Sequence, residues 1–490
     1  MNDHTAMQEK GCSGLLECRP AKPPSEGDKR QRATSVLEVR FFACHKFISG
    51  RSLQVVKRMH RLFSGELAES ATGAEAPATQ QVNPEMSIAA SVRQALLCLL
   101  LCASPVAHSA PALSPAQQRL LEFHVRDVVS QTSGHRGGDA VSGFGRWAEI
   151  KASQLVLPLA ASTADGEAPV PQELLDGISS YLAQQPITAL LIAKNGRLVV
   201  ERYQYGASPS TWMLSNSMAK SLTGIAVGVV EGQGAIKWLD DPTSLYLPSL
   251  SGHPSGQTTL RNHLRMGSGI RFRQDYSRGD DNSAFTWEVE TRGILAALAR
   301  LNRFEHEPGK RFYYANHSSA ALAAVVEAAS GRRISDLFSE AVWAPMGAES
   351  AGAWRVDGRG LALGHCCVLA RARDYLRLGI ILANGGVRPD TGQRIIPAAF
   401  MNRLGDIKLL QPSFKPPLSG DSGYESQFWI SAGVPGAFSL AGIHGQAMFI
   451  YPASQLVVLH LAVNEPVLIS GSTMAQARLR LLDVIRRYLK

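Results

Sequence analysis

The chain has 490 residues, of which 45% are hydrophobic and 19% are charged, and its mean hydropathy is −0.05. These values exclude a mostly disordered chain, a collagen-like chain and a polytopic membrane protein. The formal net charge is +9, but the basic residues are spread along the chain and form no stripe interleaved with aromatic residues. We therefore expect a mildly basic, solvated surface and no nucleic-acid partner.

The first 85 residues differ in composition from the rest of the chain. They are basic in patches, as at 29–32, and end in a polar stretch rich in Ala, Thr and Gln at 69–85. Such a composition favours disorder. We expect residues 1–85 to be a disordered extension, or to come from an over-extended reading frame whose true start is Met86.

Residues 86–110 have the three-part layout of a secretory signal peptide. A short segment with one positive charge, Arg93, precedes an apolar run at 95–103, and small, turn-prone residues follow at 104–110. The apolar run is too short for a transmembrane helix. We expect cleavage near Ser109 or Ala110 and a secreted or periplasmic protein without stable membrane insertion. The alternative is a buried helix of a cytosolic protein.

Cleavage there would leave two cysteines, the adjacent pair Cys366 and Cys367. Adjacent cysteines rarely bridge without strain, so no disulfide framework is expected. The spacing of His365 to this pair is not that of a zinc site, and we expect a buried strand or turn there instead. The sequence predicts no metal and no organic cofactor.

Helical and strand patterns mix from residue 111 to the end, with no internal repeat. Apolar residues at helical spacing predict helices, and short runs of β-branched and aromatic residues between turn residues predict strands. In chain order, the predicted elements are helices at 113–131 and 171–184, strands at 187–192 and 198–205, helices at 218–231, 260–264, 291–301, 318–329, 334–342 and 372–382, strands at 427–430, 437–443, 447–451 and 456–463, and a helix at 468–489.

The predicted strands lie near the two ends of this region, with helices between them. We therefore expect an α+β fold in which both ends of the chain complete one antiparallel sheet flanked by helices, beside a helical lobe at about 235–400. An active site is expected in the cleft between the sheet and the lobe. Residues 111–165 would form an N-terminal helix and linker, and residues 166–490 the main domain.

Ser217 and Lys220 form the only Ser-x-x-Lys sequence in the chain. They open a helix with an apolar buried face, and residues three apart on a helix are neighbours, so the lysine amine can reach the serine hydroxyl. The helix N-terminus favours negative charge on that oxygen, and burial would lower the lysine pKa enough for it to accept a proton. These are the requirements for an activated serine nucleophile. The alternative is an ordinary N-cap serine and a surface lysine.

Tyr314 and Asn316 form the only Tyr-x-Asn sequence, between a Pro-Gly turn and a predicted helix. A tyrosine near a lysine cation can act as a general base in a phenolate-like state. Asn316 could hydrogen-bond the lysine or a substrate carbonyl. The alternative is a buried aromatic residue at a loop-to-helix junction.

The stretch from Gly442 to Gln446 lies between two predicted strands. Glycine there lets a backbone approach a ligand closely, and a strand N–H could form an oxyanion hole with the N–H of Ser217. The alternative is a hairpin turn in which His444 is structural.

Together, these three motifs resemble the penicillin-recognising serine hydrolase superfamily on its class C side. Its members include β-lactamases, D-alanyl-D-alanine carboxypeptidases, family VIII esterases and 6-aminohexanoate-dimer hydrolase. The order of the motifs is the family's order. The flanking sequence PGKRFYYAN at 308–316 is similar to the family's Pro-Gly-x4-Tyr-x-Asn, and LRNHLRMGSGI at 260–270 is similar to Thr-Ile-Arg-His-Leu-Leu-x-Met-x-Ser-Gly-Ile. The resemblance covers about 171–490.

The resemblance implies a β-lactamase/transpeptidase-like fold for residues 166–490 and a two-step acyl transfer without metal or organic cofactor. Ser217 would be the nucleophile, and Lys220 and Tyr314 would move protons. The backbone amides of Ser217 and Ile443 would form the oxyanion hole. Further candidate substrate-binding residues are Gly442, Asn316, His444 and Tyr276.

The chain departs from the family in its third motif, where Lys-Thr-Gly or His-Thr-Gly is common. Here 440–442 reads Leu-Ala-Gly and 444–446 reads His-Gly-Gln, which looks more like 6-aminohexanoate-dimer hydrolase and argues against β-lactamase activity. Asp280-Asp281-Asn282 superficially resembles the Ser-Asp-Asn of class A enzymes but lacks its serine. We therefore interpret it as unrelated to the site.

The resemblance thus implies a serine hydrolase that cleaves a linear amide or ester in a small molecule or short peptide. Alternatives on the same fold are a carboxylesterase, a D-alanyl-peptide carboxypeptidase and a weak β-lactamase. An alternative from another class is a sensor module that is acylated at most once and does not turn over. The sequence does not predict the oligomeric state.

Overall fold

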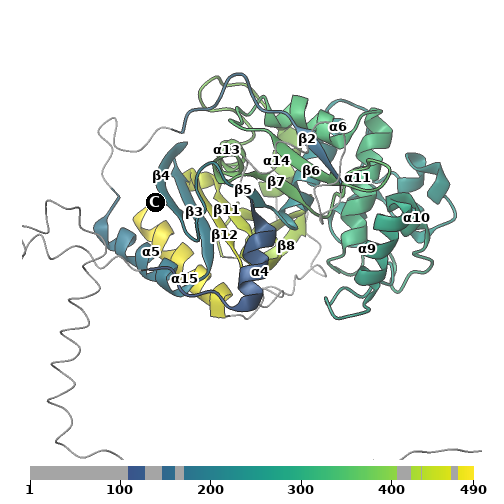
Figure 1. Ribbon diagram of the computed structural model, residues 1–490. Helices are drawn as coiled ribbons and strands as arrows, with labels where there is room; N and C mark the ends of the chain where they lie inside the picture. The colour runs from purple at the N-terminus through teal and green to yellow at the C-terminus, as the bar shows by residue number, and fades with distance from the viewer. Residues whose placement is uncertain are drawn as a thin grey trace, which may run out of the picture. The chain divides into compact units, whose positions relative to one another are not determined.

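The computed structural model describes residues 109–126, 146–159, 170–405, 421–431, 433–464 and 473–489 (Figure 1). The chain divides into two units, Met1–Cys102 and Ala103–Lys490, and all described residues belong to the second. The predicted extension at 1–85, and all but the last two residues of the predicted signal peptide at 86–110, lie outside the described residues. Among those described, no helix combines the length and the apolar character needed to span a bilayer.

The larger sheet is antiparallel, and within the described residues it has seven strands in the order β4-β3-β12-β11-β10-β9-β8. These strands are β3 (Ile187–Lys194), β4 (Arg197–Tyr203), β8 (Asp421–Glu425), β9 (Phe428–Ser431), β10 (Phe438–Ala441), β11 (Ala447–Tyr451) and β12 (Leu456–Ala462). The early strand β3 pairs with the late strand β12, with Leu456 opposite Lys194. The prediction that the two ends of the chain complete one antiparallel sheet in an α+β fold is confirmed.

Helices cover both faces of this sheet: α5 (Gln172–Gln184), α13 (Ala372–Ala383) and α15 (Thr473–Tyr488). Leu190 of β3 packs in one apolar cluster with α5 and α15. Its neighbour Leu191 faces the other side, where α13 packs on β3, β11 and β12. Because successive side chains of a strand point to opposite faces, the apolar run of β3 is buried on both. Figure 1 shows α5 and α15 side by side on one face.

The sequence does not predict a second, smaller sheet, which in the described part of the chain has five strands in the order β1-β5-β7-β6-β2. Its strands span two to five residues, which is too short for an alternating pattern to be recognised. β5 leads directly into the Ser-x-x-Lys motif, so this sheet positions Ser217. The strands are β1 (Val125–Arg126), β2 (Arg146–Ile150), β5 (Trp212–Leu214), β6 (Gly352–Val356) and β7 (Val368–Arg371).

Most other helices lie between β5 and β8 in the chain, and the range predicted as a helical lobe, about 235–400, also contains β6 and β7. Two of them, α6 and α11, pack on each other and carry the candidate motifs at their N-termini. The helices are α6 (Met218–Gly232), α7 (Pro254–Gln257), α8 (Leu260–Leu264), α9 (Asp281–Arg292), α10 (Ile294–Ala299), α11 (Asn316–Ser330), α12 (Ile334–Phe338) and α14 (Ala398–Gly405), with short turns of helix at Thr243–Leu245, Pro248–Leu250 and Ser339–Trp343.

Two predicted helices have the wrong limits. The helix predicted at 291–301 is the end of α9 followed by α10, which meet at Gly293. Gly293 has a φ of 93°, which ends a helix, and Asp357 Oδ2 accepts the Ile294 N–H at 2.9 Å at the start of the next. The helix predicted at 113–131 is α4 (Pro115–His124), which gives way to β1.

Candidate active site

Ser217 lies at the N-terminus of α6, directly after a sharp turn that leaves β5. Asn216 in this turn has a φ of 46°. The preceding Ser215 is fixed to β7, because its N–H donates to Val368 O and its Oγ accepts from the Val368 N–H, both at 2.8 Å. Between 211 and 220, Ser217 is the only residue that is not buried. The local fold thus exposes part of Ser217 while its neighbours are held in place.

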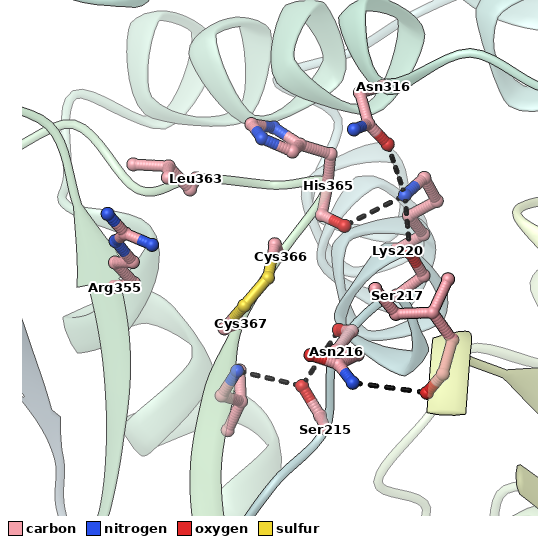
Figure 2. Close-up of a disulfide and its surroundings, with 12 residues drawn as sticks. Ser215, Asn216, Ser217, Lys220, Asn316, Arg355, Leu363, His365, Cys366 and Cys367 are labelled. Atoms are coloured by element: carbon pink, nitrogen blue, oxygen red, sulfur yellow. Dashed lines mark hydrogen bonds between the residues drawn. A yellow bond between two sulfur atoms is a disulfide. The ribbon is translucent and has the colours of Figure 1, made fainter. Parts of the chain in front are cut away.

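Lys220 follows Ser217 by three residues on α6, and its Nζ lies 2.9 Å from Ser217 Oγ. The amine also donates to Asn316 Oδ1 and to His365 O, at 2.8 Å each (Figure 2). Lys220 is 1% exposed, and burial lowers its pKa well below the ordinary value because desolvation disfavours the charged form. Within the described residues, no carboxylate forms an ion pair with it. A neutral amine is therefore favoured, and its lone pair can accept a proton.

Tyr314 lies over this amine, with Lys220 Nζ 4.9 Å from the ring centroid. Its ring stacks on Trp429, with a centroid distance of 5.4 Å and an interplanar angle of 22°. Burial and the neighbouring Tyr276 raise the pKa of Tyr314, while a hydrogen bond to the Ser217 side chain acts in the opposite direction. The protonated phenol is therefore favoured in the resting site, rather than the phenolate-like base considered from the sequence.

Asn316, at the start of α11, is held by three residues from outside its own motif. Its Oδ1 accepts from Lys220 Nζ, and its Nδ2 donates to Asn282 Oδ1 at 2.7 Å. Its backbone N–H donates to Gln274 Oε1 at 2.8 Å. The interpretation of 280–282 as unrelated to the site is wrong, because Asn282 contacts Asn316 directly. Gln274 carries no sequence signal, since its position depends on the path of the loop before α9.

Gly442 brings the end of β10 against the turn that carries Ser217. A Cβ at this position would lie 2.7 Å from Ser215 O and 3.0 Å from Ser217 N, so a larger residue would force the two segments apart. Asn216 Nδ2 donates to Ile443 O at 3.1 Å and ties the segments together. Neither the Ser217 N–H nor the Ile443 N–H donates to the backbone of a described residue. Both amides therefore have the freedom to bind a ligand oxygen.

His444 connects the loop at 442–446 to the residues that follow β12. It has a φ of 63°, and its Nδ1 lies 2.9 Å from Asn464 O, while the Asn464 N–H donates to His444 O at 3.1 Å. Gln446 Nε2 donates to Ala462 O at 2.6 Å. These contacts connect the loop to the end of β12, so the position of His444 fits the structural alternative of the sequence analysis better than direct substrate binding.

Tyr276 comes from the loop before α9 and lies near the motif residues. Its hydroxyl accepts from Gln274 Nε2 at 3.0 Å, and its N–H donates to Asp280 Oδ2 at 2.9 Å. Burial raises its pKa above the ordinary value. Tyr276 is close enough to raise the pKa of Tyr314, so the structure brings it to the same site.

Cys366 and Cys367 are joined by a disulfide between adjacent residues (Figure 2). His365 and Cys366 lie in a turn before β7, as expected. Figure 2 shows the pair beside the segment 215–217, with the His365 carbonyl directed at Lys220. No group of residues in the described part of the chain has the make-up of a metal site.

The structure thus brings the three sequence motifs together from three separate places in the chain. Two further aromatic residues, Trp429 and Tyr424, contact the Tyr314 ring and belong to none of the sequence motifs. Both come from the β8–β9 hairpin, about a hundred residues after Tyr314, and no local pattern marks them. In this arrangement, an acyl carbonyl beside Ser217 would also lie near a proton acceptor, Lys220, and a proton donor, Tyr314.

Comparison with known proteins bears on the family and the fold of the chain. The family model described as Beta-lactamase matches residues 178–468, more than half of the chain. A 6-aminohexanoate-dimer hydrolase of Paenarthrobacter ureafaciens is 26% identical over 336 residues, which cover 65% of this chain and 85% of that protein.

Solved structures share the fold at lower sequence identity. A Bacillus anthracis protein described as a 6-aminohexanoate-dimer hydrolase aligns with a TM-score of 0.58 and 22% identity, over 74% of this chain and 95% of that one. A family VIII carboxylesterase aligns with a TM-score of 0.52 and 16% identity, over 66% of this chain and 98% of that one. The resemblance seen in the sequence motifs and the β-lactamase/transpeptidase-like fold are both confirmed.

Proposed function

The chain belongs to the beta-lactamase family, and from this premise we propose that it cleaves a linear amide or an ester through an acyl-enzyme on Ser217. It is a hydrolase of the β-lactamase fold, related to an amide hydrolase and to carboxylesterases. The observation that carries the proposal is the distance of 2.9 Å between Ser217 Oγ and the Nζ of a buried lysine. Burial lowers the pKa of this amine and so favours its neutral form, which can act as a base for the serine proton.

Acylation begins with proton transfer from Ser217 to Lys220. A neutral amine has two hydrogens, which match the acceptors Asn316 Oδ1 and His365 O, and one lone pair, which can accept from the Ser217 hydroxyl. As the proton moves to Nζ, Ser217 Oγ bonds to the carbonyl carbon. The carbonyl oxygen becomes an oxyanion that the Ser217 and Ile443 amides would stabilise.

Tyr314 is the proposed route of the proton to the leaving group. Burial raises its pKa and favours the protonated phenol, against the opposing effect of the Ser217 side chain, and its ring lies 4.9 Å from Lys220 Nζ. As the carbon–nitrogen or carbon–oxygen bond breaks, the phenol donates to the leaving amine or alcohol and regains a proton from the lysine. Water then attacks the acyl carbon. One of its hydrogens passes to Ser217 Oγ as the bond between Ser217 and the acyl group breaks, and the other leaves with the acid.

The proposed substrate is a linear amide or ester of a small molecule or short peptide, rather than a β-lactam. The loop at 442–446 offers no lysine or arginine for the carboxylate that a β-lactam carries. The relative named as a 6-aminohexanoate-dimer hydrolase supports an amide substrate, and the family VIII carboxylesterase with the same fold supports an ester.

We propose a secreted or periplasmic location, on the basis of the signal-peptide pattern at 86–110. N-terminal sequencing of the protein from a fractionated native host tests this. We expect a mature chain that begins near residue 110, outside the cytoplasm. An uncleaved cytosolic chain would contradict the assignment.

Turnover of a substrate panel tests the function itself. The panel contains linear amides, carboxylic esters, a peptide that ends in D-Ala-D-Ala and a β-lactam, and the product is counted per enzyme molecule. We expect many equivalents of product from a linear amide or an ester. A single equivalent at most from every substrate would identify a sensor module, and turnover of the D-Ala-D-Ala peptide or the β-lactam alone would overturn the substrate assignment.

A further inference from the structure

The side-chain amide of Asn316 is hydrogen-bonded at both ends. Its Oδ1 accepts from Lys220 Nζ at 2.8 Å, and its Nδ2 donates to Asn282 Oδ1 at 2.7 Å. An amide has one acceptor end and one donor end. Rotation by half a turn would therefore bring the NH₂ group of Asn316 against the Lys220 amine and its oxygen against Asn282 Oδ1. The contact with Asn282 thus decides which end of Asn316 faces the lysine.

Asn282 is itself held by the structure around it. Its N–H donates to Arg273 O at 3.2 Å. The nearby Asp280 is 1% exposed and accepts from both the Ser283 N–H, at 2.7 Å, and the Tyr276 N–H, at 2.9 Å. A buried carboxylate thus joins the loop before α9 to the first turn of α9, where Asn282 lies. The backbone of Asn282 is therefore held in place beside Asn316.

The same loop holds the backbone of Asn316. Gln274 Oε1 accepts the Asn316 N–H at 2.8 Å, and the backbone N–H of Gln274 donates to the Tyr313 hydroxyl at 2.9 Å. The N-cap residue of α11, Ala315, has no side chain that could do this. Contacts from one segment, 274–282, therefore set both the backbone position and the side-chain orientation of Asn316.

We propose that Asn282 is a positioning residue of the active site: its Oδ1 holds the Asn316 amide in the orientation that keeps Asn316 Oδ1 on Lys220 Nζ. The role in catalysis rests on the proposed function. With the acceptor in place, one hydrogen of the lysine amine is directed at Asn316 and the lone pair remains directed at Ser217. Without it, the Asn316 amide can rotate and compete with Ser217 for that lone pair.

Two substitutions distinguish the effect of the acceptor oxygen at position 282 from the effect of a charge there. Asn282→Asp keeps an oxygen in the place of Oδ1 but adds a negative charge near the lysine, which favours the protonated amine. Asn282→Ala removes the acceptor. The matched control is Asn402→Asp, which adds the same charge at an exposed position of α14.

The first readout is the Lys220 pKa, which is measured by NMR on protein whose lysines are labelled at Cε. The Lys220 signal is assigned by its loss in Lys220→Arg. We expect Asn282→Asp to raise the Lys220 pKa by about one unit, and Asn402→Asp to leave it unchanged. This readout does not require hydrolysis. An unchanged Lys220 pKa in Asn282→Asp would overturn the inference, whatever the activity of the protein.

The second readout is the rate at which a serine-reactive phosphonate labels Ser217, measured across pH in the full chain. Asn282→Asp should move the half-maximal rate to higher pH and approach the wild-type maximum above it. Asn282→Ala should lower the maximal rate about tenfold at every pH, while thermal unfolding of both variants stays close to wild type. Equal rates in all three proteins would contradict a positioning role, and absence of labelling in the wild type would instead defeat the proposed function. Should Asn282→Ala fail to fold, the pH shift of Asn282→Asp alone decides.

Discussion

Lys220 Nζ lies 2.9 Å from Ser217 Oγ, and the lysine is almost completely buried while the serine reaches the surface. The surroundings of the Lys220 amine do not stabilise its positively charged form. The amine meets two carbonyl oxygens and one hydroxyl, and none of these neutralises a cation. The site therefore favours a neutral lysine next to a serine, which is the state that can start an acyl transfer.

Substitution of the lysine tests its role as a base. Lys220→Ala should lower the rate of acylation at least about a hundredfold, because Ser217 loses its proton acceptor. The rate is measured as formation of the phosphonate adduct, with Lys237→Ala, an exposed lysine, as the control. Acylation at the wild-type rate in Lys220→Ala would transfer the base role to Tyr314.

Removal of the Tyr314 hydroxyl should affect amides more than activated esters. Tyr314→Phe retains the ring that stacks on Trp429 but cannot protonate a leaving group. Amine leaving groups need that proton, whereas a nitrophenolate does not, so we expect kcat to fall about a hundredfold for an amide and much less for a nitrophenyl ester. Equal losses for the two substrates would exclude Tyr314 as the proton donor.

The close contact of Gly442 with the Ser217 turn predicts a sharp effect of one added methyl group. A Cβ there would meet Ser215 O at 2.7 Å and Ser217 N at 3.0 Å, whereas a Cβ at Gly433 would meet nothing within 4 Å. We expect Gly442→Ala to lower phosphonate labelling at least about tenfold by moving the Ile443 amide, and Gly433→Ala to have no effect. Unchanged labelling in Gly442→Ala would show that the loop does not contribute to the oxyanion site.

Because several histidines are buried, we expect the folded protein to lose stability in mild acid. Burial lowers the pKa of His263 from 6.5 to about 4, and burial together with the nearby Arg478 lowers the pKa of His460 from 6.5 to about 3. The unfolded chain therefore binds more protons below pH 6.5, and the free energy of unfolding falls as pH falls from 6.5 towards 4. Each group contributes up to about 1.4 kcal/mol per pH unit in this window.

Urea unfolding at about pH 7 and about pH 5 measures this loss, which we expect to reach a few kcal/mol. His460→Gln should reduce the difference between the two conditions, whereas His253→Gln, at a half-buried surface position, should not. Equal unfolding free energies at both pH values would mean that these histidines are not held neutral by the fold.

The residues that could be predicted from the sequence are those whose partners lie close in the chain or in a recognised motif. Ser217 and Lys220 meet because they are one helical turn apart, and the apolar face of α6 indicates burial. Tyr314 and Asn316 were found through their spacing and through the family resemblance. The pairing of early and late strands followed from their placement at the two ends of the domain.

The contacts that could not be predicted join distant segments. Trp429 reaches Tyr314, and Gln274 and Asn282 reach Asn316, only because the chain path brings separate loops and a hairpin together. The smaller sheet escaped prediction because its strands are too short to show a period. Gly293 can be seen in the sequence, but the apolar residues on either side of it have the spacing of one continuous helix. The boundary between α9 and α10 was therefore not predicted.

The measurement that tests the central claim most directly is intact-mass spectrometry of the full chain after reaction with a serine-reactive phosphonate, beside Ser217→Ala. The account predicts a single adduct on the wild type and none on the variant, with the same circular dichroism spectrum for both proteins. An adduct on Ser217→Ala as well, or a wild-type protein that stays unmodified, would contradict an activated nucleophile at Ser217.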